Sequence, residues 1–327
     1  MKKLKTGTLM HIILLSAIVL LFAASFIKLY LWDKSSAEIP TDDFSAENFD
    51  TETEDFYVTV DPDRIENHTD DGITTIVMLG DSSLNDYTDE SGVPALVREA
   101  TEATIYNCSF ANSTMSTQNT GFDGTYGNDA FSFYYLSMCI MNNIYQIQHT
   151  GLESATIKDE TFSNKLDLLE SIDFNTVDII VVSYGAEDYL LSREVETLEI
   201  PTTYRSTIYT EALAQGIDWI RMAYPHIQFI VMSPTFCCYP EEDGTYSAGD
   251  TRKNDVDATL ANYMIAAKNI AVQKNVTFLD NYWGIDIHAG NADAYLTESS
   301  TYPNADGRKM IADKLTTTIT EKIYYEK

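Results

Sequence analysis

Basic residues are scarce in this sequence. Its 327 residues include 21 Lys and Arg against 50 Asp and Glu, which gives a formal net charge of −29. A surface that binds nucleic acid or anionic lipid head groups needs a basic patch. The composition therefore argues against both kinds of partner for the main part of the chain, and we predict that it binds no nucleic acid.

Cysteine and histidine are scarce as well. The four cysteines are not spaced as metal ligands, and no pair of histidines accompanies them. We therefore predict no metal site and no cofactor, and the composition leaves disulfide pairing open. The cysteines are Cys108, Cys139, Cys237 and Cys238.

The first 33 residues differ in composition from the rest. Three lysines lie among the first five residues, and an apolar stretch follows from about residue 9 to residue 32. Its length exceeds the ~20 residues that cross a bilayer as a helix, and the lysines stay on the cytoplasmic side. We predict an uncleaved signal-anchor over residues 1–33, one transmembrane helix that holds an extracellular domain at the cell membrane. A signal peptide cleaved near residues 22–25 is the alternative.

Two further segments follow the apolar one. Asp, Glu, Thr and Ser dominate residues 34–72, which is typical of an acidic, solvated linker. Residues 73–327 alternate short apolar runs with helical patterns and form the main domain. The expected strands are 73–79, 104–108, 178–183, 228–232 and 276–279, and the expected helices are 92–103, 130–147, 162–172, 203–224, 254–273 and one from 304 past 315. This alternation predicts a three-layer α/β/α domain around a five-stranded parallel sheet.

A serine follows the first expected strand directly. The strand is apolar and rich in β-branched residues, and it stops at Gly80-Asp81-Ser82. Ligands of open α/β sheets bind beyond the carboxyl ends of the strands, so Ser82 stands where a nucleophile is useful. A solvated turn with no chemical role is the alternative for this tripeptide alone.

Gly80-Asp81-Ser82 on a five-strand background resembles the SGNH/GDSL hydrolase family of esterases and lipases. The resemblance spans essentially residues 73–325. It implies a flavodoxin-like version of the three-layer fold and ester hydrolysis without a cofactor. It also implies that Ser82 is the nucleophile and that its own backbone N–H is one donor of the oxyanion hole.

The segment after the second strand departs from the family pattern. Ala111 and Asn112 stand where the family has glycine. The family's glycine supplies a backbone N–H to the oxyanion hole, which Asn112 also has, and asparagine tolerates positive φ better than most residues. The resemblance places Asn112 in the oxyanion hole, and an ordinary polar loop remains the alternative.

The segment after the third strand carries a larger change. Glu187 stands at the position of the family's oxyanion-hole Asn. A carboxylate cannot donate a hydrogen bond, and the loss of one such donor raises the barrier by roughly 3–4 kcal/mol. Glu187 acting as the base for Ser82 is a second interpretation.

The segment before the last helix lacks the family's base and its partner. Ser299 stands at the Asp position and Tyr302 at the His position. A phenol with a pKa near 10 is a poor base at neutral pH, and serine has no charge to orient it. Of the five histidines, His288 alone lies in the same connection as Tyr302, where Asp286 or Asp293 could orient it as a migrated base. An exposed loop histidine without a role is the alternative.

Two functional hypotheses follow from these residues. In the first, the chain is a membrane-anchored extracellular SGNH/GDSL-type esterase with a degenerate site, whose ancestral activity is deacylation of an acylated cell-envelope carbohydrate and whose hydrolysis is weak or lost. In the second, it is a non-catalytic relative that binds a glycan or a partner protein. Both hypotheses rest on three positions at which this sequence departs from the family's Asn, Asp and His, namely Glu187, Ser299 and Tyr302.

Overall fold

The computed structural model describes residues 53–59, 71–196, 203–241, 245–299 and 301–323. These all belong to a compact unit formed by residues 51–327. The expected transmembrane helix over residues 1–33 lies outside the described residues. Within the described ranges, no helix has both the length and the apolar character that spanning a bilayer requires.

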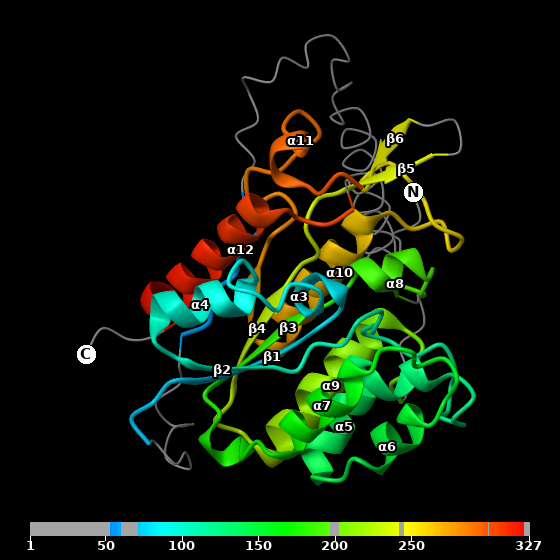
Figure 1. Cartoon of the computed structure of the whole chain (residues 1–327), viewed down its shortest axis with the longest axis vertical. Helices are drawn as coiled ribbons and strands as arrows, with labels where there is room; N and C mark the ends of the chain where they lie inside the picture. Colours follow the sequence, from blue (N-terminus) through cyan, green and yellow to red (C-terminus); the bar gives the residue numbers. More distant parts are fainter. Residues whose placement is uncertain (1–52, 60–70, 197–202, 242–244, 300, 324–327) are drawn as a thin grey trace, which may run out of the picture. The chain divides into compact units, whose positions relative to one another are not determined.

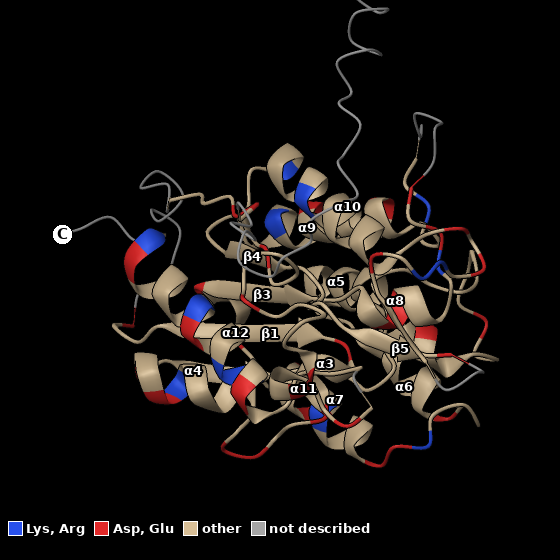
Figure 2. Ribbon diagram, turned by 90° about the horizontal axis from the view of Figure 1, so that it is seen from above, with Lys and Arg blue, Asp and Glu red and all other residues tan. Residues whose placement is uncertain are grey.

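A five-stranded parallel sheet forms the centre of the fold (Figure 1). Its strand order is β2-β1-β3-β4-β7, and all neighbouring pairs are parallel. The strands are β1 Thr75–Gly80, β2 Thr104–Asn107, β3 Ile179–Ser183, β4 Gln228–Met232 and β7 Thr277–Leu279. Figure 2 shows that charged residues gather on helices and loops while the central strands carry none. The predicted five-stranded parallel sheet is confirmed. It could be predicted because buried strands of a parallel sheet are continuous apolar runs in the sequence.

Helices cover the sheet. α4 (Val93–Thr101) packs on α12 (Ala305–Thr317), while α5 (Phe133–Asn142) packs on α9 (Tyr209–Ala223), which also contacts α10 (Leu260–Lys274). In Figure 1 the α4–α12 pair and the α5–α9 pair lie on opposite sides of the strands. The shorter helices are α3 Ser82–Asn85, α6 Gln146–Leu152, α7 Thr161–Glu170, α8 Ala186–Leu190 and α11 Ala292–Tyr295, with single turns at Gly127–Phe131, Phe174–Thr176 and Thr318–Lys322.

One predicted helix is interrupted. The pattern over residues 130–147 predicts a single long helix, whereas the structure has a 3₁₀ turn, then α5 and then α6. Asn143 ends α5 with a left-handed backbone (φ 50°), and its N–H donates to the carbonyls of Cys139 and Ile140. Asparagine is one of the few residues that adopts this conformation readily. The apolar periodicity continues across the break and so hides it.

Residues 53–59, which fall inside the expected linker, form an edge segment on the sheet. Phe56 and Phe278 of β7 pair in antiparallel sense, each N–H donating to the other's carbonyl at 3.0 and 2.7 Å. Gln228 of β4 also donates to the carbonyl of Val58 at 2.7 Å. Residues 53–59 therefore pack on the sheet, in the same compact unit as the residues from 73 onward. Backbone pairing at a sheet edge satisfies N–H and C=O groups whatever the side chains are.

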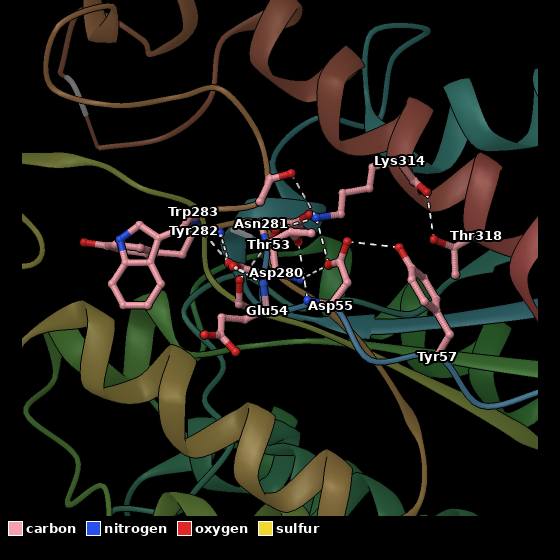
Figure 3. Close-up of polar contacts among 12 residues, drawn as sticks. Thr53, Glu54, Asp55, Tyr57, Asp280, Asn281, Tyr282, Trp283, Lys314 and Thr318 are labelled. Carbon is pink, nitrogen blue, oxygen red and sulfur yellow. Dashed lines mark hydrogen bonds and ion pairs between the residues drawn. The ribbon is translucent and has the colours of Figure 1, made fainter. Parts of the chain in front are cut away.

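Asp280 connects the edge segment to the loop after β7 (Figure 3). Its carboxylate accepts hydrogen bonds from the N–H groups of Glu54 at 3.2 Å, Tyr282 at 2.9 Å and Trp283 at 2.9 Å. Its own N–H donates to the carboxylate of Asp55 at 2.7 Å. The edge segment thus holds the first residues of the β7–α11 loop.

A buried ion pair completes this contact. Nζ of Lys314 on α12 lies 2.8 Å from Oδ1 of Asp55, and the two side chains are 14% and 7% exposed. Lys314 also donates to the carbonyls of Asp280 and Gly284 (Figure 3). One ammonium group therefore joins the last long helix, the edge segment and the β7–α11 loop.

The loop after β4 contains a small antiparallel hairpin of β5 (Cys238–Pro240) and β6 (Tyr246–Ala248). Cys237 and Cys238 are buried here, and all four cysteines of the chain are buried free thiols. Burial raises the pKa of Cys237 to about 12, so this thiol is a packing residue and not a reactive one.

Candidate active site

Ser82 lies at the carboxyl end of β1. Asp81 caps α3, with its carboxylate accepting from the N–H of Ser83 at 3.0 Å, so Ser82 is the first residue of that short helix. A Cβ atom on Gly80 would lie 2.8 Å from the carbonyl oxygen of Ser183, so only glycine allows β1 to end this close to β3. The backbone N–H of Ser82 is one of the helix-terminal donors that no intrahelical bond uses.

Glu187 reaches Ser82 from the end of β3. Gly185 takes a φ of 127°, which favours glycine, and starts α8, whose first turn contains Glu187. The hydroxyl of Ser82 donates to Oε1 of Glu187 at 2.6 Å. Ser82 and Glu187 are 3% and 5% exposed. The two side chains that the resemblance assigns to nucleophile and oxyanion hole are therefore in direct contact.

Asn112 approaches the same serine from the loop after β2. Its φ is 54°, and its backbone N–H donates to Oγ of Ser82 at 2.9 Å. The backbone φ is positive, and the N–H points at the serine oxygen; the role of this N–H as an oxyanion-hole donor stays a prediction. Because β2, β1 and β3 are neighbours in the sheet, the loops after them meet at one edge.

Tyr302 joins the site from the connection between α11 and α12. Its phenolic hydroxyl donates to Oε1 of Glu187 at 3.0 Å, so this single carboxylate oxygen accepts from both Tyr302 and Ser82. Ser299 is exposed, and its side chain contacts the hydroxyl of Thr297 at 2.9 Å. The structure thus brings Tyr302 to Ser82 through Glu187 and shows Ser299 bonded within its own loop.

His288 makes contacts in its own loop. Nδ1 of its ring accepts from the N–H of Gly290 at 3.0 Å, and Nε2 lies 3.6 Å from Oδ1 of Asp286. The hydroxyl of Ser82 is engaged by Glu187 and by the N–H of Asn112 instead. The geometry gives the serine a carboxylate as its hydrogen-bond acceptor.

Asp188 supports the site in a way that the sequence did not indicate. Its carboxylate accepts from the N–H groups of Met115 at 2.8 Å and Ser116 at 3.2 Å and from the hydroxyl of Ser116 at 3.0 Å. These bonds attach the loop after β2, which contains Asn112, to the start of α8. The sequence offers only the acidic pair Glu187-Asp188, and such pairs usually lie in solvent, so the sequence alone does not reveal this role.

Three buried carboxyl groups at the site have pKa values above the usual range of Asp and Glu. Burial, assisted by the nearby charge of Glu187, raises the pKa of Asp81 to about 7. Burial also raises the pKa of Asp188 to about 6, against hydrogen bonds that lower it. The pKa of Glu187 is raised by burial, while its hydrogen bonds from Ser82 and Tyr302 act in the opposite direction. The site therefore holds several carboxyl groups that titrate closer to neutrality than usual.

A small cavity lies beside these residues. Its volume is about 30 Å³, and its wall includes Asp81, Tyr184, Asn281 and Tyr302. This volume is enough for a water molecule or a group of similar size. Within the described ranges, no group of His, Cys, Asp and Glu side chains has the arrangement of a metal site.

No protein-family model matches the sequence, and no curated protein matches it. Solved structures do match. One is 17% identical, covers 76% of this chain and 96% of its own, and superposes with a TM-score of 0.54. A protein from Lactobacillus plantarum is 14% identical with the same coverage and a TM-score of 0.51. A carbohydrate acetylesterase from Sinorhizobium meliloti is 11% identical, covers 75% of this chain and 98% of its own, and has a TM-score of 0.43.

Other structural neighbours are proteins assigned to the G-D-S-L and SGNH hydrolase families. The neighbours of this chain thus include SGNH/GDSL hydrolases, as the resemblance predicted. All of these identities lie below 25%, so the likeness shows the fold alone.

Proposed function

We propose that this protein is a serine esterase or acyl-transfer enzyme of the SGNH type, with Ser82 as its nucleophile. One observation carries the proposal. Oγ of Ser82, at the carboxyl edge of the sheet, donates to Glu187 at 2.6 Å and accepts from the N–H of Asn112 at 2.9 Å. A serine that donates to a carboxylate and lies beside backbone N–H donors has the parts that acyl transfer requires.

The proposed oxyanion donors are the backbone N–H groups of Ser82 and Asn112. A third donor, which the family's Asn supplies, is replaced by Glu187. Loss of one such donor costs roughly 3–4 kcal/mol of barrier. We therefore expect turnover to be slow compared with that of an esterase that keeps all three donors.

The proposed substrate is an acylated carbohydrate of the cell envelope, reached by a domain that residues 1–33 anchor in the membrane. The apolar stretch and the lysines before it support the anchor. The strongly acidic composition supports a substrate that is not a polyanion such as nucleic acid.

The test is turnover of p-nitrophenyl acetate by the full chain in detergent micelles. We expect Ser82→Ala to abolish turnover above background, and the matched control Ser171→Ala, on an exposed serine, to leave it unchanged. Equal rates for wild type and Ser82→Ala would contradict the nucleophile assignment.

Binding without catalysis is the second candidate function. The observation that favours it is the near-complete burial of Ser82 and Glu187 together with the carboxylate in place of an amide donor. In that case the surface at this edge of the sheet binds a glycan or a partner protein, and wild type and Ser82→Ala show the same background rate.

A further inference from the structure

We propose that Glu187 is the general base of this site and takes the hydroxyl proton of Ser82. The inference rests on the proposed function, in which Ser82 is the nucleophile. It assigns to a carboxylate the role that a histidine has in most serine hydrolases. Glu187 would then be a catalytic residue, because it touches the reacting oxygen.

The direction of the serine hydrogen carries the first step of the argument. A hydroxyl has one hydrogen to donate and two lone pairs that accept. The N–H of Asn112 points at Oγ of Ser82 and occupies a lone pair, at 2.9 Å. The single hydrogen of Ser82 is directed at Oε1 of Glu187, 2.6 Å away. This distance lies within the reach that proton abstraction requires.

Tyr302 provides the orienting group. Its hydroxyl donates to the same Oε1 atom at 3.0 Å, which holds the carboxylate in the geometry that faces Ser82. Burial and the charge of Glu187 raise the pKa of Tyr302, so the phenol stays protonated and remains a donor. Nucleophile, base and orienter form a continuous hydrogen-bonded chain, as in other activated nucleophiles.

The surroundings of Glu187 suit a base. Asp86, after α3, places negative charge near it, while Asp81 has a raised pKa because of burial and the charge of Glu187. Tyr302 and Tyr126 lie near it as phenols. The neighbouring Asp188 is bonded to the loop after β2 and lies near the charge of Arg193. Burial raises the pKa of Glu187 above that of an ordinary glutamate, which brings it closer to neutral pH and makes it a stronger base.

The reaction balances with these groups alone. Oγ of Ser82 forms a bond to the ester carbonyl carbon while its proton passes to Oε1 of Glu187, and the carbonyl electron pair becomes the oxyanion. Collapse of this intermediate breaks the bond to the alcohol, which leaves with the proton from Glu187. Water then attacks the acyl-serine and gives a proton to Glu187. Collapse of the second intermediate breaks the bond to Oγ of Ser82, which regains that proton from Glu187 as the acid leaves.

A protonated Glu187 has a competing role, because a neutral carboxyl group donates as the family's amide does. The two roles predict opposite pH dependence. A base must be ionised, so turnover rises as pH increases through the titration of Glu187. A donor must be protonated, so turnover falls over the same range.

The experiment compares the full-length wild type, Glu187→Gln and Glu187→Asp, with Glu160→Gln as a control on an exposed glutamate. Turnover of p-nitrophenyl acetate is measured between about pH 4 and pH 9, and labelling of Ser82 by a fluorophosphonate is followed by mass spectrometry. We expect Glu187→Gln to lower Ser82-dependent turnover and labelling by about 100-fold or more and to remove the pH dependence. Glu187→Asp keeps a carboxylate at a longer distance, so it should retain the pH dependence with reduced turnover.

The outcomes separate the inference from the function on which it rests. Turnover or labelling that depends on Ser82 but is equal in wild type and Glu187→Gln overturns the base and leaves the nucleophile in place. A wild-type rate that falls with increasing pH overturns it in favour of the donor role. If wild type shows neither turnover nor labelling at Ser82, Glu187 does not activate the serine, and both proposals fail.

Discussion

One carboxylate oxygen organises the site at the scale of single residues. Oε1 of Glu187 accepts from Ser82 and from Tyr302, and the N–H of Asn112 binds the serine from the other side. Each of these contacts depends on a different property: an ionisable group, a phenol that stays protonated, and a backbone that adopts positive φ. Substitutions at Tyr302 and Asn112 test two of these properties, and a substitution at Asp81 tests the protonation of the carboxyl group that the charge of Glu187 acts on.

The first substitution is Tyr302→Phe, which removes a hydrogen bond that lowers the pKa of Glu187. The pKa of Glu187 should rise, so the pH at which Ser82-dependent turnover reaches half its maximum should move to higher pH. We also expect turnover at neutral pH to fall by about tenfold because the carboxylate loses its orientation. The pH–rate profile checks this, and an unchanged midpoint would show that Tyr302 has no influence on the base.

The second substitution concerns Asn112, whose contribution to the site is its backbone. Asn112→Gly keeps the N–H and the φ of 54°, so turnover should stay within about threefold of wild type. Asn112→Val keeps the N–H but disfavours this φ, so turnover should fall by about tenfold or more. A loss of activity in the glycine variant would instead assign a role to the amide side chain. Steady-state rates on p-nitrophenyl acetate distinguish the two results.

The third substitution concerns the protonation of Asp81, whose pKa is raised from 3.8 to about 7 by burial and by Glu187. Between these values the unfolded chain has lost this proton while the folded chain keeps it, so increasing pH favours unfolding. The free energy of unfolding should therefore decrease from about pH 5 to about pH 8, and Asp81→Asn should reduce that decrease. Urea unfolding at the two pH values measures it, and identical decreases would contradict the prediction.

At the scale of elements, the stability of β7, the last strand of the sheet, depends on its contacts with residues 53–59, the edge segment that precedes β1. The edge segment pairs with β7, and Lys314 of α12 bonds to Asp55 and to two carbonyls of the β7–α11 loop. That loop continues toward Tyr302 through α11. The ion pair is buried, so removal of one partner leaves an uncompensated charge.

Lys314→Ala should destabilise the fold by about 3 kcal/mol, because Asp55 loses its charged partner and two carbonyl groups lose a donor. The double variant Asp55→Ala/Lys314→Ala should cost less than the sum of the two single variants, since it leaves no unpaired charge. Urea unfolding of the four proteins completes the cycle. Additive free energies would show that the pair is not coupled.

At the scale of the whole molecule, residues 53–59 pack in the same compact unit as the sheet, so the stability of the fold should depend on them. A fragment of residues 51–327 should unfold cooperatively. A fragment of residues 73–327 should be less stable by several kcal/mol and more sensitive to proteases near β7, because the edge of the sheet and Lys314 become exposed to solvent. Equal stability of the two fragments would show that the edge segment contributes nothing to the fold.

Sequence patterns predicted the strands better than the helices. The strand from residue 179 is continuous in Ile and Val and is recognisable without its neighbours. The helical pattern over 130–147 remained continuous through Asn143, where the backbone turns. Residues 53–59 contain the short run Phe56-Tyr57-Val58 within a longer segment dominated by Asp, Glu, Thr and Ser. The linker prediction missed this run because its partners at and after β7 lie more than 200 positions away.

The sequence by itself predicted that a buried strand ends at Gly80-Asp81-Ser82. Its resemblance to the SGNH/GDSL family predicted that Tyr302 and Ser299 replace the family's histidine and aspartate. Only the tertiary structure decided that Glu187, 105 positions from Ser82, directs its carboxylate at the serine and shares one oxygen with Tyr302. The reason is physical: strand order brings separate loops to one edge, and burial there gives a carboxylate a pKa and a partner that no local pattern encodes.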